Sequence, residues 1–274
     1  MGDVRAALAE AARVLEPVSA TARLDAELLM AHALGCSREG MILARLGDAV
    51  PEAFAGLVTR RLTCEPVAYI IGTRGFWTID LGVGPGVLVP RADSETLIQA
   101  AVAHFSGRSP ATILDLGTGP GTLLLAALDE WPGASGLGID RSEVAIGYAR
   151  ANAERLGMAG RARFATGDWA QGIDGRFDLV LANPPYIGSG ETLMAEVRNH
   201  EPGEALFAGE DGLDAYRAIV PELARLLAPG GAAIVEIGAR QGEAVTALVR
   251  AAGLEPQLRF DLGGNPRAIL ALER

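Results

Sequence analysis

The chain has 274 residues, of which 49% are hydrophobic and 21% charged, and its 24 basic and 34 acidic side chains give a net charge of −10. This balance is typical of a globular protein with a sizeable core. The acidic excess argues against a surface built to neutralise many nucleic-acid phosphates.

No apolar run approaches the roughly 18 residues of a membrane span, and the first residues do not begin a signal peptide. The two cysteines, Cys36 and Cys64, show no metal-ligand or redox spacing, and the three histidines are scattered. We therefore expect a cytoplasmic protein with no bound metal and no membrane attachment.

The beginning of the chain has the apolar periodicity of helices. Apolar residues recur at helical spacing in two segments, Val4, Leu8, Ala11 and Leu15, then Leu24, Leu28, Ala31 and Leu34. Gly35 ends the second segment, Ser37 can cap a third helix, and Pro51 can open a fourth. Residues 1–72 are therefore predicted to form a helical bundle. Because this region carries no catalytic chemistry, we expect it to recognise the substrate.

Residues 73–95 are predicted to form a β-hairpin that links two domains. Two short extended pieces, Phe76 to Leu81 and Val87 to Val89, are separated by Gly82-Val83-Gly84-Pro85-Gly86. No helix follows these glycines directly, which favours turns over a phosphate-binding loop. The charged run after this hairpin includes Arg91 and Glu95. It either reaches into a neighbouring site or caps the next helix.

Residues 96–274 alternate between strands and helices. Strands are predicted at Thr112–Leu116, Gly136–Asp140, Arg161–Ala165, Phe177–Ala182, Ala232–Gly238, Gln257–Leu262 and Arg267–Leu272, with helices between the first five. This alternation predicts an α/β fold with a mostly parallel sheet covered by helices on both faces. Only four residues join the last two strands, so one strand at the sheet edge is predicted to run antiparallel.

One buried strand stops at Asn183-Pro184-Pro185-Tyr186. Proline fixes its own φ and pushes the preceding residue out of the helical region, so this segment is predicted to be a stiff, extended turn. Asn183 offers an amide oxygen, Pro184 a carbonyl outside the ladder, and Tyr186 a flat ring. Two acceptors in a rigid frame can hold an –NH2 group, which makes this turn the candidate catalytic site. Asn-Pro alone is also a common turn signal.

A glycine-rich turn follows the strand that ends at Leu116. It reads Gly117-Thr118-Gly119-Pro120-Gly121, and a helix begins after it. The dinucleotide-binding pattern G-x-G-x-x-G is not matched, because Thr122 stands at its third glycine. Asp140 ends the next strand, where an acid can accept both hydroxyls of a ribose. These features favour a nucleoside without a pyrophosphate.

Gly167-Asp168-Trp169 follow the third strand of this region. Asp168 can accept a hydrogen bond from the exocyclic amine of adenine, and Trp169 can cover the ring. The alternative is a polar loop with a packed indole. Together with the glycine turn and Asn183, these residues predict an adenosyl cofactor that delivers a group to nitrogen.

These motifs resemble those of S-adenosylmethionine-dependent methyltransferases, and nearly the whole chain resembles the HemK/PrmC family. The matching segments are Glu65 to Gly72, Phe76-Trp77, Val89-Pro90-Arg91 with Asp93 and Glu95, Asp115 to Gly121, Asn183 to Tyr186, Glu201-Pro202 with Ala205-Leu206, Asp211-Gly212-Leu213, and Glu236-Ile237-Gly238 with Gln241. The chain departs from the family at Pro120, where a small hydroxyl residue is usual, and at Ala92, where proline is usual.

The resemblance implies a Rossmann-like class I methyltransferase domain over residues 96–274. It also implies that the chain methylates the glutamine amide in the Gly-Gly-Gln loop of peptide chain release factors. The release factors are then protein partners, and no nucleic acid is bound directly. The candidate cofactor residues are Asp115, Gly117, Thr118, Gly119, Pro120, Gly121, Asp140, Asp168, Trp169 and Asn183. The candidate substrate residues are Asn183, Pro184, Pro185, Tyr186, Arg91 and Glu95.

Two other functions stay open at this point. A methyltransferase acting on an exocyclic amine of a nucleic-acid base would use the same Asn-Pro-Pro-Tyr turn, with Tyr186 stacked on the flipped base. A docking protein for release factors or the ribosome would keep the fold without catalysis. The net charge counts against the first function, and the intact Asn183 and Asp140 count against the second.

Overall fold

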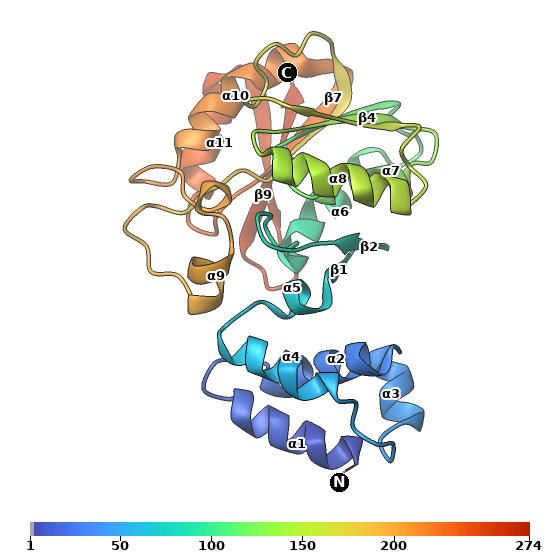
Figure 1. Ribbon diagram of the computed structural model, residues 1–274. Coiled ribbons are helices and arrows are strands. Elements are labelled where there is room, and N and C mark those ends of the chain that lie inside the picture. The colour runs from blue at the N-terminus through green and yellow to red at the C-terminus, as the bar shows by residue number, and fades with distance from the viewer. Residues whose placement is uncertain (1–2) are drawn as a thin grey trace. The chain divides into compact units, whose positions relative to one another are not determined.

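The computed structural model describes residues 3–274, and the described chain divides into two compact units (Figure 1). Unit 1 contains residues 3–73 and 193–201, and unit 2 contains residues 74–192 and 202–274. Residues 1 and 2, where the predicted helical region begins, lie outside the described residues. Within the described part, no helix is long and apolar enough to cross a membrane.

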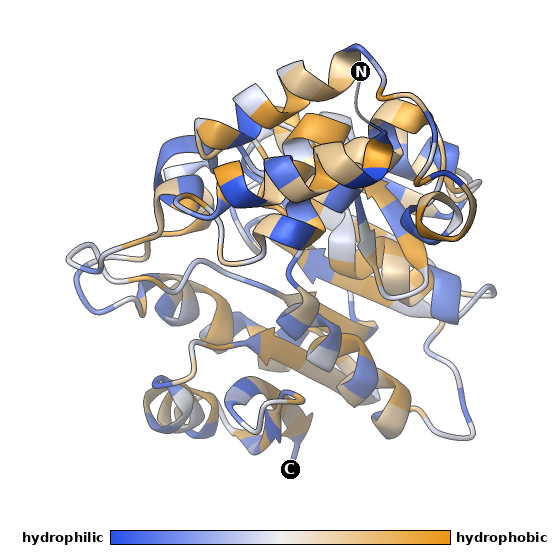
Figure 2. Cartoon of the chain, turned by 90° about the horizontal axis from the view of Figure 1, so that it is seen from below, coloured by the Kyte–Doolittle hydropathy of each residue, from blue (hydrophilic) through white to orange (hydrophobic). Residues whose placement is uncertain are grey.

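Unit 1 is helical, and its elements are α1 (Val4–Leu15), α2 (Ala22–Leu34), α3 (Arg38–Ala44), α4 (Ala53–Leu62), α5 (Val67–Ile71) and α9 (Ala195–His200). The predicted inner face of α1 is confirmed, because Val4, Leu8, Ala11 and Leu15 are all buried. Ser37 caps α3 by accepting a hydrogen bond from the N–H of Gly40. Figure 2 shows the alternation of hydrophilic and hydrophobic residues along these helices.

The predicted inner face of α2 is only partly confirmed. Ala31 is buried and Leu34 packs against the core of unit 1, but the rest of the face differs. Leu24 is 41% exposed, whereas Asp25 and Glu27 are buried. Both acids are paired: Arg61 Nε lies 2.7 Å from Asp25 Oδ2, and Arg23 and Arg38 bind the two oxygens of Glu27. Apolar periodicity cannot find such a face, because a buried carboxylate is tolerated only where a specific cation compensates its lost hydration.

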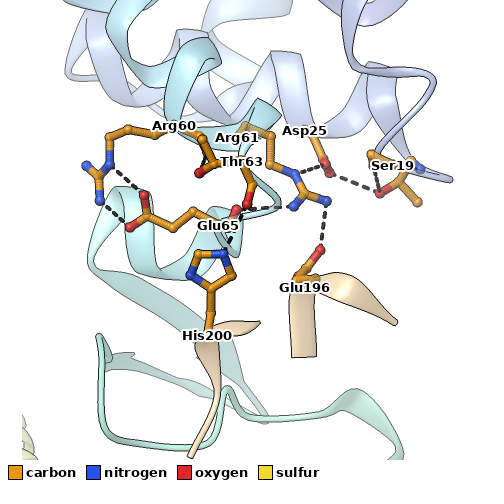
Figure 3. Close-up of polar contacts among 9 residues, drawn as sticks. Ser19, Asp25, Arg60, Arg61, Thr63, Glu65, Glu196 and His200 are labelled. Carbon is orange, nitrogen blue, oxygen red and sulfur yellow. Dashed lines mark hydrogen bonds and ion pairs between the residues drawn. The ribbon is translucent and has the colours of Figure 1, made fainter. Parts of the chain in front are cut away.

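Helix α9 lies in the sequence between the two segments of unit 2 but belongs to unit 1. Glu196 Oε2 lies 2.7 Å from Nη2 of Arg61, so this buried guanidinium binds both Asp25 and Glu196 (Figure 3). His200 Nε2 donates to the carbonyl oxygen of Thr63 at 3.1 Å. These polar contacts, rather than an apolar stripe, attach α9 to the other helices of unit 1. The six-residue helix was not predicted from the sequence.

Unit 2 is built on a seven-stranded sheet in the order β5-β4-β3-β6-β7-β9-β8. Its strands are β3 (Thr112–Leu116), β4 (Ser135–Asp140), β5 (Ala162–Thr166), β6 (Phe177–Ala182), β7 (Leu227–Glu236), β8 (Leu254–Phe260) and β9 (Pro266–Glu273). All neighbours pair in parallel except β9, which is antiparallel to both β7 and β8. The predicted antiparallel strand is therefore present, but it lies one place in from the edge, because the tight β8–β9 link folds β9 back between β8 and β7.

The helices of unit 2 are α6 (Glu95–His104), α7 (Thr122–Glu130), α8 (Glu143–Arg155), α10 (Asp214–Leu226) and α11 (Gly242–Ala251). Figure 1 shows α7 and α8 on one side of the sheet and α10 and α11 on the other. The helix predicted between β5 and β6 was wrong, because the described residues 167–176 form turns there. Gly172 and Gly175 have positive φ values, which L side chains rarely adopt.

A two-stranded hairpin precedes α6. It consists of β1 (Thr73–Phe76) and β2 (Ile79–Gly82), which turn at Trp77-Thr78 rather than at the predicted glycine stretch, and Val87 to Val89 do not form a strand. The backbone N–H of Trp77 donates to Oε1 of Glu95 at 3.0 Å. This bond helps to hold Trp77 in a left-handed conformation with φ of 54°. Tryptophan rarely adopts this conformation, so the sequence did not predict the turn here.

Candidate active site

A cavity of about 560 Å³ lies beside the carboxyl ends of β3, β4 and β6. Ligands bind at this end of the strands in open α/β sheets, and the volume is in the usual range for small-molecule sites. The predicted site residues that line it are Asp115, Gly117, Thr118, Gly119, Pro120, Asp140, Asp168, Trp169, Asn183, Pro185 and Arg91. Four other predicted residues, Gly121, Pro184, Tyr186 and Glu95, are not among its lining residues.

The glycine turn needs glycine for two separate reasons. Gly117, Gly119 and Gly121 all have positive φ, at 74°, 56° and 88°. A Cβ on Gly117 would also lie 3.1 Å from the Trp169 ring. Pro120 precedes Gly121, the N-cap of α7, and therefore lies outside the helix rather than in its first turn. The turn thus brings its backbone close to the cavity, with Trp169 packed against it.

Asp115 is completely buried at the cavity wall. Its Oδ2 accepts hydrogen bonds from the Thr118 hydroxyl at 2.7 Å and from the N–H of Leu124 at 3.2 Å. Burial raises the pKa of Asp115 to about 7. Its Oδ1 has no hydrogen-bond partner among residues 3–274. A buried polar atom of this kind is satisfied when a polar group of a ligand or a water reaches it.

Asp140 faces the cavity from the end of β4. Its Oδ2 accepts from the N–H of Gly119 at 2.8 Å, and its Oδ1 accepts from the N–H of Ser142 at 2.9 Å. Each carboxylate oxygen has two lone pairs, so both retain one acceptor position for a ligand hydroxyl. The sequence predicted the position of this acid. It did not predict that the same carboxylate would connect the glycine turn to the start of α8 through these two hydrogen bonds.

Asn183 is half-buried at the end of β6, where its Nδ2 donates to Ser94 Oγ at 3.1 Å. Ser94 is buried and ends the short 3-10 helix η1 (Ala92–Ser94). Of the hydrogen bonds formed by the described residues, none uses Oδ1 of Asn183. This geometry leaves the amide oxygen available to a donor in the cavity. Ser94 was missed from the sequence, because a serine beside charged residues reads as a helix cap.

The structure places Tyr186 behind the turn. Its ring packs against the core of unit 2, and its carbonyl oxygen accepts from Nε2 of Gln241 at 2.9 Å. Burial, and then the nearby charge of Glu236, raise the pKa of the Tyr186 phenol to about 12. Gln241 also donates to the carbonyl of Gly212 at 3.1 Å. Tyr186 therefore anchors the turn to the core of unit 2. Gln241 was not identified as a site residue from the sequence.

The two charged residues proposed for the substrate are separated by the fold. Arg91 lines the cavity. Glu95 instead binds the hairpin through the N–H of Trp77. Of the two interpretations of this charged run, a position at the site applies to Arg91, whereas the Glu95 side chain binds the hairpin and does not cap α6.

Two family models match the chain. The one described as the PrmC N-terminal domain matches residues 6–72, and the one described as a methyltransferase domain matches residues 108–251. The release factor glutamine methyltransferase of Rhodospirillum rubrum is 45% identical over 258 residues, which cover 92% of this chain and 79% of that protein. The protein of the same name from Bradyrhizobium diazoefficiens is 43% identical over 272 residues, covering 95% of this chain and 91% of that protein.

A solved structure is similar to this chain in its fold. It is a 16S rRNA methyltransferase from T. Thermophilus in complex with AdoMet and guanosine, with a TM-score of 0.54. The two sequences are 18% identical, and the match covers 74% of this chain and 50% of that chain. At this identity the likeness concerns the fold, which is that of class I methyltransferases.

Proposed function

Because the chain belongs to the family of release factor glutamine methyltransferases, we propose that it methylates the side-chain amide of the glutamine in the Gly-Gly-Gln loop of peptide chain release factors. One observation of the site carries this proposal. Asn183 is held by Ser94 with its amide oxygen free, in a cavity that the glycine turn and Asp140 also line. The methyl donor is S-adenosylmethionine.

The described residues fit this cofactor. Asp140 has acceptor positions for ribose hydroxyls, the glycine turn lets a ligand approach its backbone, and the unpaired Oδ1 of Asp115 can accept from a polar group. We propose that Asp168 and Trp169 border the adenine, since both line the same cavity. When bound, S-adenosylmethionine supplies a methyl group on a positively charged sulfur, which is the electrophile of the reaction.

Asn183 and Pro184 are proposed to activate the nucleophile. An amide nitrogen is a poor nucleophile because its lone pair is conjugated to the carbonyl. If Oδ1 of Asn183 and the carbonyl oxygen of Pro184 accept the two amide hydrogens, they hold the nitrogen with its lone pair toward the methyl group and stabilise it in the transition state. The nitrogen gains the methyl group and then loses one proton to solvent.

The direct experiment is mass spectrometry of a purified release factor after incubation with the protein and S-adenosylmethionine. The expected result is one added methyl group, located on the glutamine of the Gly-Gly-Gln loop. Label found in nucleic acid, with a steep inverse dependence on salt, would instead support the amine-on-base function. Cofactor binding without any turnover would support the docking protein. We also propose a cytoplasmic location, because release factors act at the ribosome.

Asp140→Ala should weaken S-adenosylmethionine binding by about 1.5–3 kcal/mol, through loss of charge-assisted hydrogen bonds. Asp140→Asn should lose less, because it keeps an acceptor for the N–H of Gly119. Isothermal titration calorimetry measures both variants. Asp174→Ala, which removes an exposed carboxylate from the same unit, is the matched control and should bind normally. Unchanged affinity of Asp140→Ala would refute the ribose assignment.

Unit 1 is proposed to provide a second contact with the release factor. A glutamine in a glycine-rich loop offers few features to recognise, so discrimination requires a contact away from the chemistry. Deleting residues 1–64 is a poor test, because it also removes the partners of Glu196 and His200. Point substitutions on the surface of unit 1 avoid this problem.

Leu43→Ser is such a substitution, since Leu43 on α3 is 86% exposed. We expect it to raise the Michaelis constant for an intact release factor roughly threefold or more while leaving a short Gly-Gly-Gln peptide unaffected. Leu262→Ser is the control, because Leu262 in unit 2 is 97% exposed. Steady-state kinetics with both substrates make the comparison. Equal effects of the two substitutions would remove the support for recognition by α3.

A further inference from the structure

Glu236 is a buried carboxyl group for which the proposed chemistry has no use. It ends β7 with 1% of its surface exposed, and its Oε2 has no hydrogen-bond partner among residues 3–274. Two hydroxyl groups, those of Ser94 and Tyr186, are close enough to this carboxyl to favour its ionised form. Tyr186 belongs to the Asn183–Tyr186 turn, and Ser94 accepts a hydrogen bond from Asn183 of that turn. Burying a carboxyl group that lacks a full set of partners costs stability. Its position beside this turn therefore needs a functional explanation.

Ser94 connects Glu236 to Asn183. A serine hydroxyl has one hydrogen to donate, and its oxygen can accept. Nδ2 of Asn183 donates to Ser94 Oγ at 3.1 Å, which leaves the Ser94 hydrogen free to point at Glu236. An ionised carboxylate only accepts hydrogen bonds, so it enforces this direction. The hydrogen bonds then run from Asn183 through Ser94 to Glu236.

The direction of these bonds decides which end of the Asn183 amide faces the cavity. If the carboxyl of Glu236 is protonated, it can donate to Ser94 Oγ. The Ser94 hydrogen can then turn toward Asn183, where it requires the amide oxygen as acceptor. The Asn183 amide would rotate and present its NH2 group to the substrate amide, whose two hydrogens it cannot accept. An ionised Glu236 prevents this rotation.

We propose that Glu236 is a positioning residue which, through Ser94, holds the Asn183 amide with its oxygen toward the substrate. The inference rests on the proposed function, because it assigns Asn183 the task of accepting an amide hydrogen. Ser94 is part of the same device, and Tyr186 contributes a second hydroxyl to the Glu236 carboxyl. Neither Glu236 nor Ser94 touches the reacting atoms in this assignment.

Several charged and titratable groups surround Glu236. Burial raises its pKa to about 7, the Ser94 hydroxyl and Arg267 of β9 oppose the rise, and the carboxylate of Asp93 adds to it. Tyr216 of α10 and Tyr186 face it as neutral phenols, since burial raises the pKa of both. Asp115 is the other buried acid of this unit with a pKa raised to about 7. The ionisation of Glu236 is therefore expected within the working pH range, and only a variant can separate it from that of Asp115.

The kinetic test compares Glu236→Gln and Ser94→Ala with the wild-type protein between pH 6 and 8.5. In the wild type, kcat should rise with pH as Glu236 ionises. Both variants should lose this rise and show kcat reduced roughly tenfold or more, with the Michaelis constant for S-adenosylmethionine nearly unchanged. Glu255→Gln, which changes an exposed glutamate on β8, is the control and should keep the wild-type profile. A wild-type profile in folded Glu236→Gln would overturn the proposal.

A second measurement does not depend on turnover. The side-chain NH2 signal of Asn183 in the nitrogen-15 NMR spectrum is assigned by its absence in Asn183→Ala. It should shift with pH around 7 in the wild type and stay constant in Glu236→Gln and Ser94→Ala. If the signal does not titrate in the wild type, the inference fails even if the release factor is methylated. If it titrates but no release factor is methylated, the proposed function fails and the coupling of Glu236 to Asn183 stands.

Discussion

Asn183→Ala should reduce turnover about a hundredfold or more while leaving the affinity for S-adenosylmethionine nearly intact. The side-chain oxygen that this variant loses is proposed to interact most strongly with the substrate amide in the transition state. The bond to Ser94 disappears as well, but Ser94 keeps its contact with Glu236. Single-turnover kinetics at saturating release factor measure the chemical step, and calorimetry measures cofactor binding.

Asn199→Ala is the matched control for this variant. It removes an exposed asparagine amide from α9 in unit 1 and should leave both quantities unchanged. If Asn183→Ala loses cofactor affinity and rate in equal measure, Asn183 acts on the cofactor rather than on the substrate amide. A variant with wild-type turnover would remove Asn183 from the mechanism altogether.

Arg61→Met should have the largest effect on stability, with a loss of about 3–5 kcal/mol from unit 1. Arg61 and Asp25 have side-chain exposures of only 4% and 7%, and Glu196 completes the network (Figure 3). Burial alone would lower the pKa of Arg61, but the hydrogen bond and charge of Asp25 and the charge of Glu196 more than reverse this. Removing the cation leaves a buried carboxylate without its main partner.

Urea unfolding of the full chain measures this loss. All three tryptophans, Trp77, Trp131 and Trp169, lie in unit 2, so their fluorescence reports on that unit, whereas circular dichroism reports on the helices of both. The dichroism transition of Arg61→Met should begin at lower urea, while the fluorescence transition should move less. Arg60→Met is the neighbouring control, because its pair with Glu65 is partly exposed and worth about 0–1 kcal/mol. Equal destabilisation by both variants would contradict the assignment.

The sequence predicted the sheet well because buried parallel strands carry continuous apolar runs. The strands Thr112–Leu116 and Phe177–Ala182 were predicted with their observed ends, and Asn183 and Asp140 followed from where such strands end. Apolar spacing predicted the inner face of α2 only in part, because buried Asp25 and Glu27 depend on arginines elsewhere in the chain. Periodicity records burial of apolar groups only.

The supporting residues of the site could not be predicted for a related reason. Ser94, Glu236 and Gln241 act through polar contacts between segments far apart in sequence. Each of them has an ordinary local explanation as a cap, a strand end or a turn residue. Only the parallel pairing of β6 with β7 brings Glu236 close to the turn after Asn183. Arg91 lines the cavity and Glu95 binds the hairpin. This difference likewise depends on the position of the turn at Trp77.

The path of the chain through α9 has a consequence for its synthesis. Helices α1 to α5 leave the ribosome early, but Glu196 follows Arg61 by more than a hundred residues, a delay on the order of ten seconds at typical translation rates. Until then the nascent helices hold Arg61 with Asp25 alone, and most of the cofactor-binding half is already made. The first unit to begin folding is therefore completed late. A chain that stalls before residue 196 would expose Arg61 without its acidic partner Glu196 to chaperones and proteases.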